Sequence, residues 1–244
     1  MILFDPLFSL TRSSIFIARF CFLGWPGAGA SGGGGRYYRG MNSDKRAIRD
    51  EMRARRRGLS PAVQRQHGQM LALRVARQSW FIASERVALY LPSDGEIDTR
   101  PLIKLCWREG KQAYLPRLRA GGVMEFARYQ ATDILVRGPY ELLQPSPAAA
   151  TARVESLDAV LTPLVAFTRD GERLGMGGGF YDRALADTPG SSPWIAGLAH
   201  SCQQVDVLPR EPWDRKVAVV MTETGAVWPP SGKRYISRTR LLRR

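Results

Sequence analysis

Residues 173–182 read Arg-Leu-Gly-Met-Gly-Gly-Gly-Phe-Tyr-Asp, and they follow an apolar run at residues 158–161 that predicts a buried strand. Glycine has no β-carbon, so this backbone can take positive φ angles and turn successive N–H groups towards phosphate oxygens. A helix expected at residues 180–186 would add its N-terminal end. Arg173 offers a fork of donors and Asp182 a carboxylate for Mg²⁺. The loop is either a phosphate site or a glycine-rich connecting turn.

Strands and helices alternate on both sides of this loop. Two helices come first, one from Ser43 or Asp44 to Gly58 and one from Ser60 towards Trp80. Further elements are a helix at residues 99–109, a hairpin arm at 124–129, and buried strands at 87–91, 112–115, 158–161, 194–198 and 217–222. This alternation predicts an α/β fold with a mostly parallel sheet and helices on both faces, a Rossmann-like three-layer sandwich. Ligands of such folds bind at the carboxyl ends of the strands.

Residues 1–40 differ in composition from the rest of the chain. A patchy apolar segment leads into the flexible, glycine-rich residues 27–35. We expect residues 1–40 to lie outside the fold, as a start codon assigned too early, an organellar transit peptide or a poor signal peptide. We favour the first, because Met41 precedes an ordinary soluble N-terminus. Residues 41–230 are then one domain, and residues 231–244 are a basic tail.

The chain is basic, with 36 Lys and Arg residues against 22 Asp and Glu residues and a formal net charge of +14. This charge suits anionic ligands such as nucleotides, polyglutamate tails or nucleic acid, and does not choose among them. Because no recognition helix or RNA-binding motif accompanies it, we expect no nucleic-acid partner. Four arginines near the end of the first helix are predicted to form a solvated basic face: Arg53, Arg55, Arg56 and Arg57.

The cysteines and histidines predict no metal centre. Cys21, Cys106 and Cys202 are odd in number and far apart, so neither a disulfide framework nor a zinc site is expected, and a reducing cytoplasmic compartment fits. His67 is expected to be a surface or half-buried residue and His200 a polar loop residue. No apolar run is long enough to cross a bilayer, so we expect no membrane partner.

Four segments, in order along the chain, resemble the 5-formyltetrahydrofolate cyclo-ligases, also called 5,10-methenyltetrahydrofolate synthetases. The glycine-rich run is similar to the family signature Arg-Leu-Gly-x-Gly-x-Gly-[Tyr/Phe]-Tyr-Asp. Residues 45–49 (Lys-Arg-Ala-Ile-Arg) resemble the N-terminal helix of the family. Residues 90–99 (Tyr-Leu-Pro-Ser-Asp-Gly-Glu-Ile-Asp-Thr) resemble its first strand and loop, and residues 113–117 (Ala-Tyr-Leu-Pro-Arg) its second strand. The resemblance covers about residues 44–228.

The resemblance implies a reaction and a role for each matching residue. The reaction is ATP-dependent cyclisation of 5-formyltetrahydrofolate to 5,10-methenyltetrahydrofolate, with Mg²⁺ as cofactor. The implied catalytic residues are Arg173 and Asp182, and Asp182 is also the implied metal ligand. The implied ATP-binding residues are Lys45, Arg46, Ala47, Ile48, Arg49, Arg173, Leu174, Gly175, Met176, Gly177, Gly178, Gly179, Phe180 and Tyr181. The implied folate-binding residues are Leu91, Glu96, Tyr140, Met176, Gly177, Gly178, Gly179 and Phe180.

One position departs from the family pattern. Relatives resemble one another in an Asp followed four residues later by a second Asp that can join the metal site. Here Asp214 is present and Ala218 occupies the later position. Asp214 is therefore expected either to assist the metal ligand or to form a structural salt bridge.

Two other functions compete with the cyclo-ligase. A sugar-phosphate isomerase or CoA-transferase-like enzyme could use the same loop on a similar sheet, but no catalytic carboxylate is assigned for it. A basic nucleic-acid-binding protein would account only for the net charge. We expect a cytoplasmic monomer, or a mitochondrial or plastid protein if residues 1–40 are a transit peptide.

Overall fold

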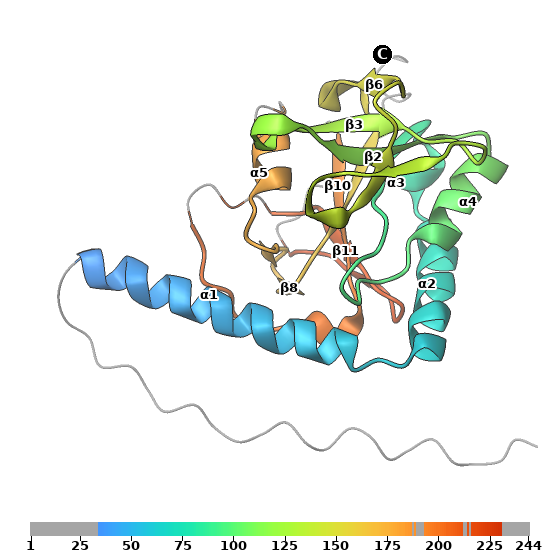
Figure 1. The fold of residues 1–244 in the computed structure, drawn as a ribbon. Coiled ribbons are helices and arrows are strands. Elements are labelled where there is room, and N and C mark those ends of the chain that lie inside the picture. Colours follow the sequence, from blue (N-terminus) through green and yellow to red (C-terminus); the bar gives the residue numbers. More distant parts are fainter. Residues whose placement is uncertain (1–33, 187, 189–192, 212–213, 215, 231–244) are drawn as a thin grey trace, which may run out of the picture.

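The computed structural model describes residues 34–186, 188, 193–211, 214 and 216–230, with side chains from Asp44 onwards (Figure 1). Residues 1–33 and the basic tail at 231–244 lie outside the described part. Eight strands form one sheet in the order β12-β11-β10-β7-β1-β2-β3-β6. Their bounds are β1 (Arg86–Ala88), β2 (Gln112–Leu118), β3 (Met124–Arg128), β6 (Thr151–Ala152), β7 (Ala159–Pro163), β10 (Trp194–Leu198), β11 (Val219–Met221) and β12 (Ala226–Val227).

The five central strands of the sheet, β2-β1-β7-β10-β11, are parallel. The outer strands β12, β3 and β6 pair antiparallel. The chain adds β2 on one side of β1 and β7 on the other, so the strand order reverses between β1 and β7. Such a reversal opens a crevice at the carboxyl ends of the two strands, where ligands of α/β folds bind.

Helices cover both faces of the sheet, which confirms the predicted fold class. On one face, α2 (Pro61–Val75), α3 (Ser79–Ile82) and α4 (Arg100–Arg108) pack Leu71, Trp80 and Leu102 into the main core (Figure 1). On the other face, α5 (Phe180–Ala184) brings Tyr181 and Leu185 against the strands. Among the described residues, no helix is both long and apolar enough to span a membrane.

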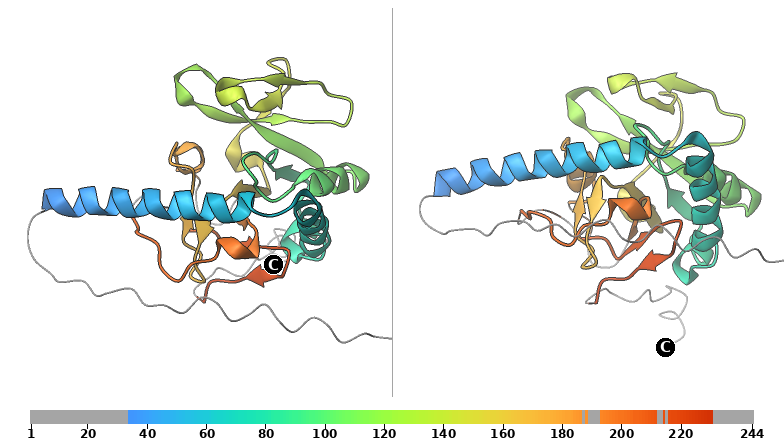
Figure 2. Two further views of the ribbon diagram at one scale, coloured as in Figure 1. Left: turned by 60° about the horizontal axis from the view of Figure 1, so that its bottom comes forward. Right: turned by 90° about the horizontal axis from the view of Figure 1, so that it is seen from below.

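Helix α1 (Gly34–Arg57) lies along one end of the sheet, drawn in blue in Figures 1 and 2. Its Arg56 donates hydrogen bonds to the carbonyl of Leu164, after β7, and to that of Asp94, after β1. The helix therefore crosses the carboxyl ends of the central strands. The predicted start at Ser43 or Asp44 is wrong, because α1 continues back to Gly34. Ser and Asp can cap a helix, but they do not force one to begin.

Other predicted elements agree with the structure, with local differences. Strand β10 and the Ser60 cap of α2 are confirmed, and the Ser60 hydroxyl accepts a hydrogen bond from the N–H of Val63. Strand β2 was expected to end before Pro116 but continues to Leu118. Beyond Tyr114 only β3 pairs with it, so the missing N–H of Pro116 leaves no partner unsatisfied.

Two short hairpins were not predicted from the sequence. They are β4 (Leu135–Arg137) with β5 (Leu143–Pro145), and β8 (Ala166–Phe167) with β9 (Arg173–Leu174). Strands of two or three residues contain too few side chains for an alternating pattern to be recognised. The second hairpin matters for function because β9 opens the glycine-rich loop.

We predict that the α2 face is a main source of stability. The Leu71 side chain is fully buried, whereas Leu73, two residues later, is 63% exposed. Leu71→Ala should lower the free energy of unfolding by about 2–5 kcal/mol, because it removes buried methyl groups and leaves a cavity. The matched change Leu73→Ala should alter it by less than about 0.5 kcal/mol. Urea denaturation measures both values, and equal losses would contradict the packing described.

Candidate functional site

The glycine-rich loop joins β9 to α5 through residues that other amino acids could not easily replace. Gly177 and Gly179 have φ angles of 100° and 62°, which side chains rarely allow. A β-carbon on Gly178 would lie 2.7 Å from the ring of Phe180. The helix that follows has five residues rather than the expected seven, so its dipole adds little to the site. The backbone N–H groups of the glycines are therefore the main groups with which this loop could bind an anion.

Arg173 and Asp182, at the two ends of the loop, form an ion pair with each other. The Arg173 side chain is 5% exposed and that of Asp182 is 33% exposed. The ion pair therefore joins the two ends of the loop, and it consists of the residue predicted to donate hydrogen bonds to phosphate and the residue predicted to bind the metal. Asp182 remains reachable from solvent, as a metal ligand must be.

Helix α1 reaches the same loop through Arg49, and its Lys45 reaches two carboxylates that lie outside the loop. Arg49 Nε donates a 2.8 Å hydrogen bond to the carbonyl of Gly175. Lys45 is almost fully buried, and its Nζ lies 3.1 Å from Asp214 Oδ2 and 3.8 Å from Glu211 Oε1. Two cations one helical turn apart on α1 thus contact the loop and the carboxylates of Asp214 and Glu211, respectively.

The residues between Lys45 and Arg49 on α1 face other directions. Arg46 is 86% exposed and pairs with Asp50, Ala47 is exposed, and Ile48 packs against a small apolar cluster that includes Met52. The structure therefore brings Arg49 to the loop and Lys45 to Asp214, but it brings the side chains of Arg46 and Ala47 to neither place.

A small polar depression lies beside the loop. It is lined by Glu172, Arg173, Leu208, Pro209, Arg210, Asp214 and Lys216. Lys216 Nζ lies 3.5 Å from Glu172 Oε1, while Arg210 is exposed. Arg210 and Lys216 were missed as candidate residues, although their proximity in sequence to Asp214 was a usable signal. The depression combines several cations with carboxylates, which suits a metal-bound polyphosphate.

Ala218 does not line this depression. Its side chain packs against the main apolar core, and its N–H donates to the carbonyl of Ile195. Asp214 pairs with Lys45 and accepts a 2.8 Å hydrogen bond from the N–H of Glu211. Asp214 was expected either to assist the metal ligand or to form a salt bridge, and the structure shows the salt bridge.

Glu96 lies in the loop after β1, close to the reversal of strand order. It is 9% exposed and accepts a 3.0 Å hydrogen bond from the N–H of Ser93. Burial raises the pKa of its carboxyl group, and the nearby Arg56 opposes that rise. Leu91, in the same segment, is half-buried against the core. A buried carboxylate with accepting capacity left is suited to a polar group of a flat ring ligand.

Two tyrosine hydroxyl groups are buried near Glu96. The hydroxyls of Tyr90 and Tyr181 have no hydrogen-bond partner among the described residues. Burial raises both pKa values, and the charge of Glu96 raises them further. Buried hydroxyls without partners are uncommon and are expected where a ligand or water completes the bonding. Tyr181 belongs to the glycine-rich run, so this group links that run to Glu96.

Tyr140 meets the glycine-rich loop at Phe180. The two rings pack edge to face with centroids 6.0 Å apart. Tyr140 is 74% exposed and has a φ angle of 60°, which is strained for an aromatic residue. The two predicted aromatic substrate residues therefore lie together, and both have surface available to stack against a planar ligand.

Arg56 contradicts the prediction of a solvated basic face. Its side chain is fully buried, and beyond its two carbonyl partners its Nη2 lies 2.9 Å from Asp94 Oδ2 and 3.8 Å from Met176 Sδ. Arg53, which is half-buried, and Arg57, which is exposed, also pair with Asp94, and the exposed Arg55 pairs with Glu51. The predicted solvated face is thus wrong for Arg56 and agrees with the exposure of Arg55 and Arg57. The prediction failed because a helix of this length has a face that meets the sheet, and helical periodicity places Arg56 on the same side as Met52 and Arg49.

His200 is also buried, against expectation. Its ring lies beside that of His67, and burial together with this neighbour lowers its pKa to about 4. His67 is half-buried, as expected. Cys106 is a buried residue, and burial raises the pKa of its thiol to about 12, which agrees with an inert packing role.

Comparisons with known proteins agree on one family. Residues 41–223 match the model of the 5-formyltetrahydrofolate cyclo-ligase family. The 5-formyltetrahydrofolate cyclo-ligase of Escherichia coli K12 is 40% identical over 180 residues, covering 72% of this chain and 98% of the relative. The cyclo-ligase of Mus musculus is 28% identical over 193 residues, covering 75% and 95%.

Solved structures give the same result. The 5,10-methenyltetrahydrofolate synthetase of Aquifex aeolicus superposes with a TM-score of 0.69 at 29% identity, over 80% of this chain and 97% of that one. The corresponding protein of Mycoplasma pneumoniae gives a TM-score of 0.61 at 25% identity, over 74% and 99%.

We predict that Arg56 stabilises the fold far more than its neighbour Arg55. Arg56→Met should lower the free energy of unfolding by about 3–5 kcal/mol, because it removes one member of a buried ionic cluster. Arg55→Met removes an exposed pair and should cost less than about 1 kcal/mol. Urea denaturation of the two variants distinguishes them, and a mild effect of Arg56→Met would show that its contacts are dispensable.

We predict a loss of stability in acid that depends on Asp94. Burial alone would raise the pKa of Asp94, but hydrogen bonds from Arg53, Arg57 and Arg56 outweigh it and lower the pKa to about 2. A lowered folded-state pKa stabilises the fold above the unfolded value near 4, and this contribution, on the order of 2 kcal/mol, disappears as pH falls from about 4 to 2.

Denaturation from pH 5 to 2 should therefore show a steeper decline for the intact chain than for Asp94→Asn. The exposed Asp50→Asn change should leave the decline unaltered. If Asp94→Asn also leaves it unaltered, then Asp94 is not the titrating group.

Proposed function

The chain belongs to the 5-formyltetrahydrofolate cyclo-ligase family, and from this premise we propose which of its residues carry the reaction. The enzyme catalyses ATP-dependent cyclisation of 5-formyltetrahydrofolate to 5,10-methenyltetrahydrofolate, with release of ADP and phosphate. The observation that best supports our assignment is that α1 brings Arg49 to the carbonyl of Gly175 in the glycine-rich loop and Lys45 to Asp214, which lies beside that loop. Cations, bare amides and a reachable carboxylate then lie together, as phosphoryl transfer requires.

We place the phosphates of ATP along the glycine-rich loop and the polar depression beside it. Backbone N–H groups of residues 175–179 would contact phosphate oxygens, with Arg49 on one side and Arg173 on the other. Lys216 and Arg210 extend the positive charge over the depression. We assign no direct phosphate contact to the side chains of Arg46 and Ala47, because both point into solvent.

Mg²⁺ fits the oxygen ligands on this side of the loop. Asp182 is the proposed ligand because its carboxylate is partly open to solvent. The bound ion would neutralise charge on the transferred phosphoryl group. Asp214 is occupied by Lys45, so its contribution is to hold that cation beside the loop. The remaining ligands of Mg²⁺ would be phosphate oxygens and water.

We place the folate between Glu96 and the pair Tyr140–Phe180. Glu96 would accept hydrogen bonds from the pterin or from N10, and the Tyr90 and Tyr181 hydroxyls would gain the partners that they lack. Tyr140 and Phe180 would stack against the planar ring system, with Leu91 and Met176 as apolar neighbours. We assign Glu96 to orientation and not to proton abstraction.

The reaction then needs positioning more than a protein nucleophile. The formyl oxygen attacks the γ-phosphorus, ADP leaves, and an imidate phosphate forms. N10 then attacks the activated carbon and closes the five-membered ring, and departure of phosphate with loss of the N10 proton gives the methenyl product. Arg173 and the loop amides would stabilise the charge that moves onto the phosphoryl oxygens.

We further propose that the enzyme is a cytoplasmic monomer whose macromolecular contacts do not include nucleic acid or membrane. Residues 41–230 would form the catalytic domain, with residues 1–40 and 231–244 outside it. The family model, which begins at Met41, supports this division on the N-terminal side.

We predict that Arg173→Ala and Asp182→Ala lose turnover by about 100-fold or more, the usual cost of removing one group that stabilises transition-state charge. Turnover is measured as the ATP-dependent near-ultraviolet absorbance of the methenyl product. The exposed Arg169→Ala variant, which removes the same charge nearby, should keep its turnover.

Circular dichroism should show that all three variants remain folded. Normal turnover in a folded Arg173→Ala or Asp182→Ala variant would mean that the phosphate site lies elsewhere. Absence of ATP-dependent product from the intact chain would contradict the reaction itself.

A further inference from the structure

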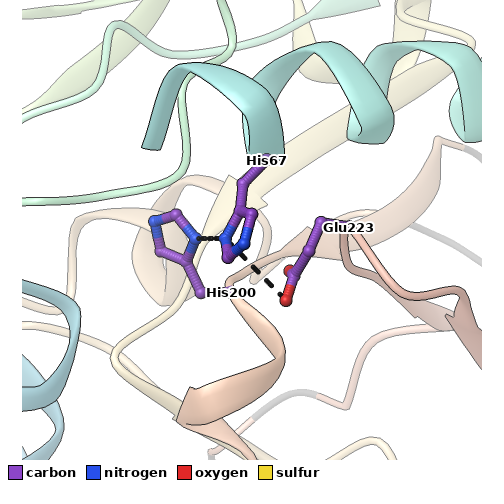
Figure 3. Close-up of side chains that lie close together, drawn as sticks. All are labelled: His67, His200 and Glu223. Atoms are coloured by element: carbon purple, nitrogen blue, oxygen red, sulfur yellow. Dashed lines mark hydrogen bonds and ion pairs between the residues drawn. The ribbon is translucent and has the colours of Figure 1, made fainter. Parts of the chain in front are cut away.

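His67, His200 and Glu223 form a compact cluster away from the glycine-rich loop (Figure 3). His67 is on α2, His200 follows β10, and Glu223 follows β11. The two His Nδ1 atoms are 2.8 Å apart, and His67 Nδ1 lies 3.8 Å from Glu223 Oε1. One potential ligand atom from each side chain lies within 4.8 Å of the other two. These are the chain's two histidines, although 133 residues separate them.

The cluster is held in place by the structure around it. The Glu223 carboxylate accepts hydrogen bonds from the N–H and hydroxyl of Ser201, and Arg74 Nε on α2 donates a 2.7 Å bond to the Glu223 carbonyl. The backbone N–H of His200 donates a hydrogen bond to the side-chain oxygen of Gln203, and the side-chain nitrogen of Gln203 donates to two backbone carbonyls. Ligand positions fixed by such outer contacts are typical of metal sites.

The protonation pattern of the histidines also suits a cation. A 2.8 Å contact between two Nδ1 atoms needs one proton between them, so one ring donates and the other accepts. His200 Nε2 is buried without a hydrogen-bond partner among the described residues. A cation that replaced the shared proton would turn both Nδ1 atoms into ligands. Glu223 Oε1, which accepts hydrogen bonds from the hydroxyl and the N–H of Ser201, would exchange one of them for the cation.

We propose that His67, His200 and Glu223 bind one Zn²⁺ ion, or a divalent ion of similar preference, as a three-residue site completed by water. Two nitrogens and one carboxylate oxygen suit zinc, whereas Mg²⁺ prefers oxygen ligands alone. Tetrahedral Zn–N bonds of about 2.0–2.1 Å place two ligand nitrogens ~3.3 Å apart, so the rings have to separate by about half an ångström. The site joins three elements and is separate from the proposed Mg²⁺ ligand Asp182.

The position of the cluster connects it to the substrate loop. The backbone of Gly95, in the loop that carries Glu96, and the guanidinium of Arg56 both lie close enough to the His200 ring to influence its pKa. Next to His67, Gly68 packs so closely that a β-carbon there would lie 2.6 Å from the Asp98 carbonyl. Zinc at this place would fasten α2 to the segments after β10 and β11, directly behind the loop that carries Glu96.

The test uses Asp182→Ala as the starting protein, so that the proposed Mg²⁺ position contributes no binding. Zinc affinity is measured by competition with a chromogenic chelator, and Co²⁺ absorption reports the coordination geometry. Substitution of an outer-shell partner costs metal sites about 10- to 100-fold in affinity, so His67→Gln or Glu223→Gln should weaken zinc binding by more than about 100-fold. Gln at position 67 can still hydrogen-bond to His200, which favours folding.

Cys202→Ser is the matched control, because this half-buried thiol lies near Glu223 and could bind zinc instead. It should leave the affinity unchanged. Zinc should also raise the thermal unfolding midpoint of the starting protein and not that of His67→Gln. In ¹⁵N spectra of the starting protein, zinc should shift the Nδ1 resonances of both histidines.

Three results would overturn the proposal. The first is the absence of zinc binding with both Nδ1 resonances unchanged. The second is a zinc affinity in the His67→Gln and Glu223→Gln variants that equals that of the starting protein, and the third is loss of binding in Cys202→Ser. The first result would identify the pair as a neutral hydrogen bond that serves packing alone.

Discussion

The buried guanidinium of Arg56 is the contact on which the other parts of the site depend. It lies where the strand order reverses between β1 and β7, and it donates to backbone carbonyls on both sides of that reversal. It also touches Asp94 and Met176, one in the proposed folate loop and the other in the glycine-rich loop. A single planar cation with five donors thereby joins the segments that follow β1 and β7 at the carboxyl ends of the central strands.

Cations and carboxylates are paired throughout the proposed nucleotide site. Lys45 pairs with Asp214, Arg173 with Asp182, and Lys216 with Glu172. We infer that ATP and its metal exchange these partners, so that phosphate takes the cations and the metal takes Asp182. Because each of these six side chains already has a nearby opposite charge, none of them incurs the high cost of an isolated buried ion.

Much of the fold could be predicted because each central strand is apolar and bounded by a cap, glycine or proline. The signature at residues 173–182 likewise identified the family, and Lys45 and Arg49 were placed on one helix face by spacing. Sequence alone could not place Arg56, because a run of arginines looks the same whether the helix lies in solvent or across a sheet. It could not find the His67–His200–Glu223 cluster either, since no local pattern relates residues so far apart. Both failures have the same cause, because the surroundings of a helix face depend on segments that come much later in the chain.

Helix α1 is made first and receives some of its partners last. Arg56 bonds to a carbonyl 108 residues further on, and Lys45 to a carboxylate 169 residues further on. During synthesis on the ribosome, Asp94 can therefore pair with the arginines of α1 early, whereas Lys45 has to wait for Asp214 until most of the chain has emerged. Contacts of such long sequence separation slow folding and expose intermediates to aggregation. Helix α1 can thus complete its native contacts only after residues 164 and 214 have been made.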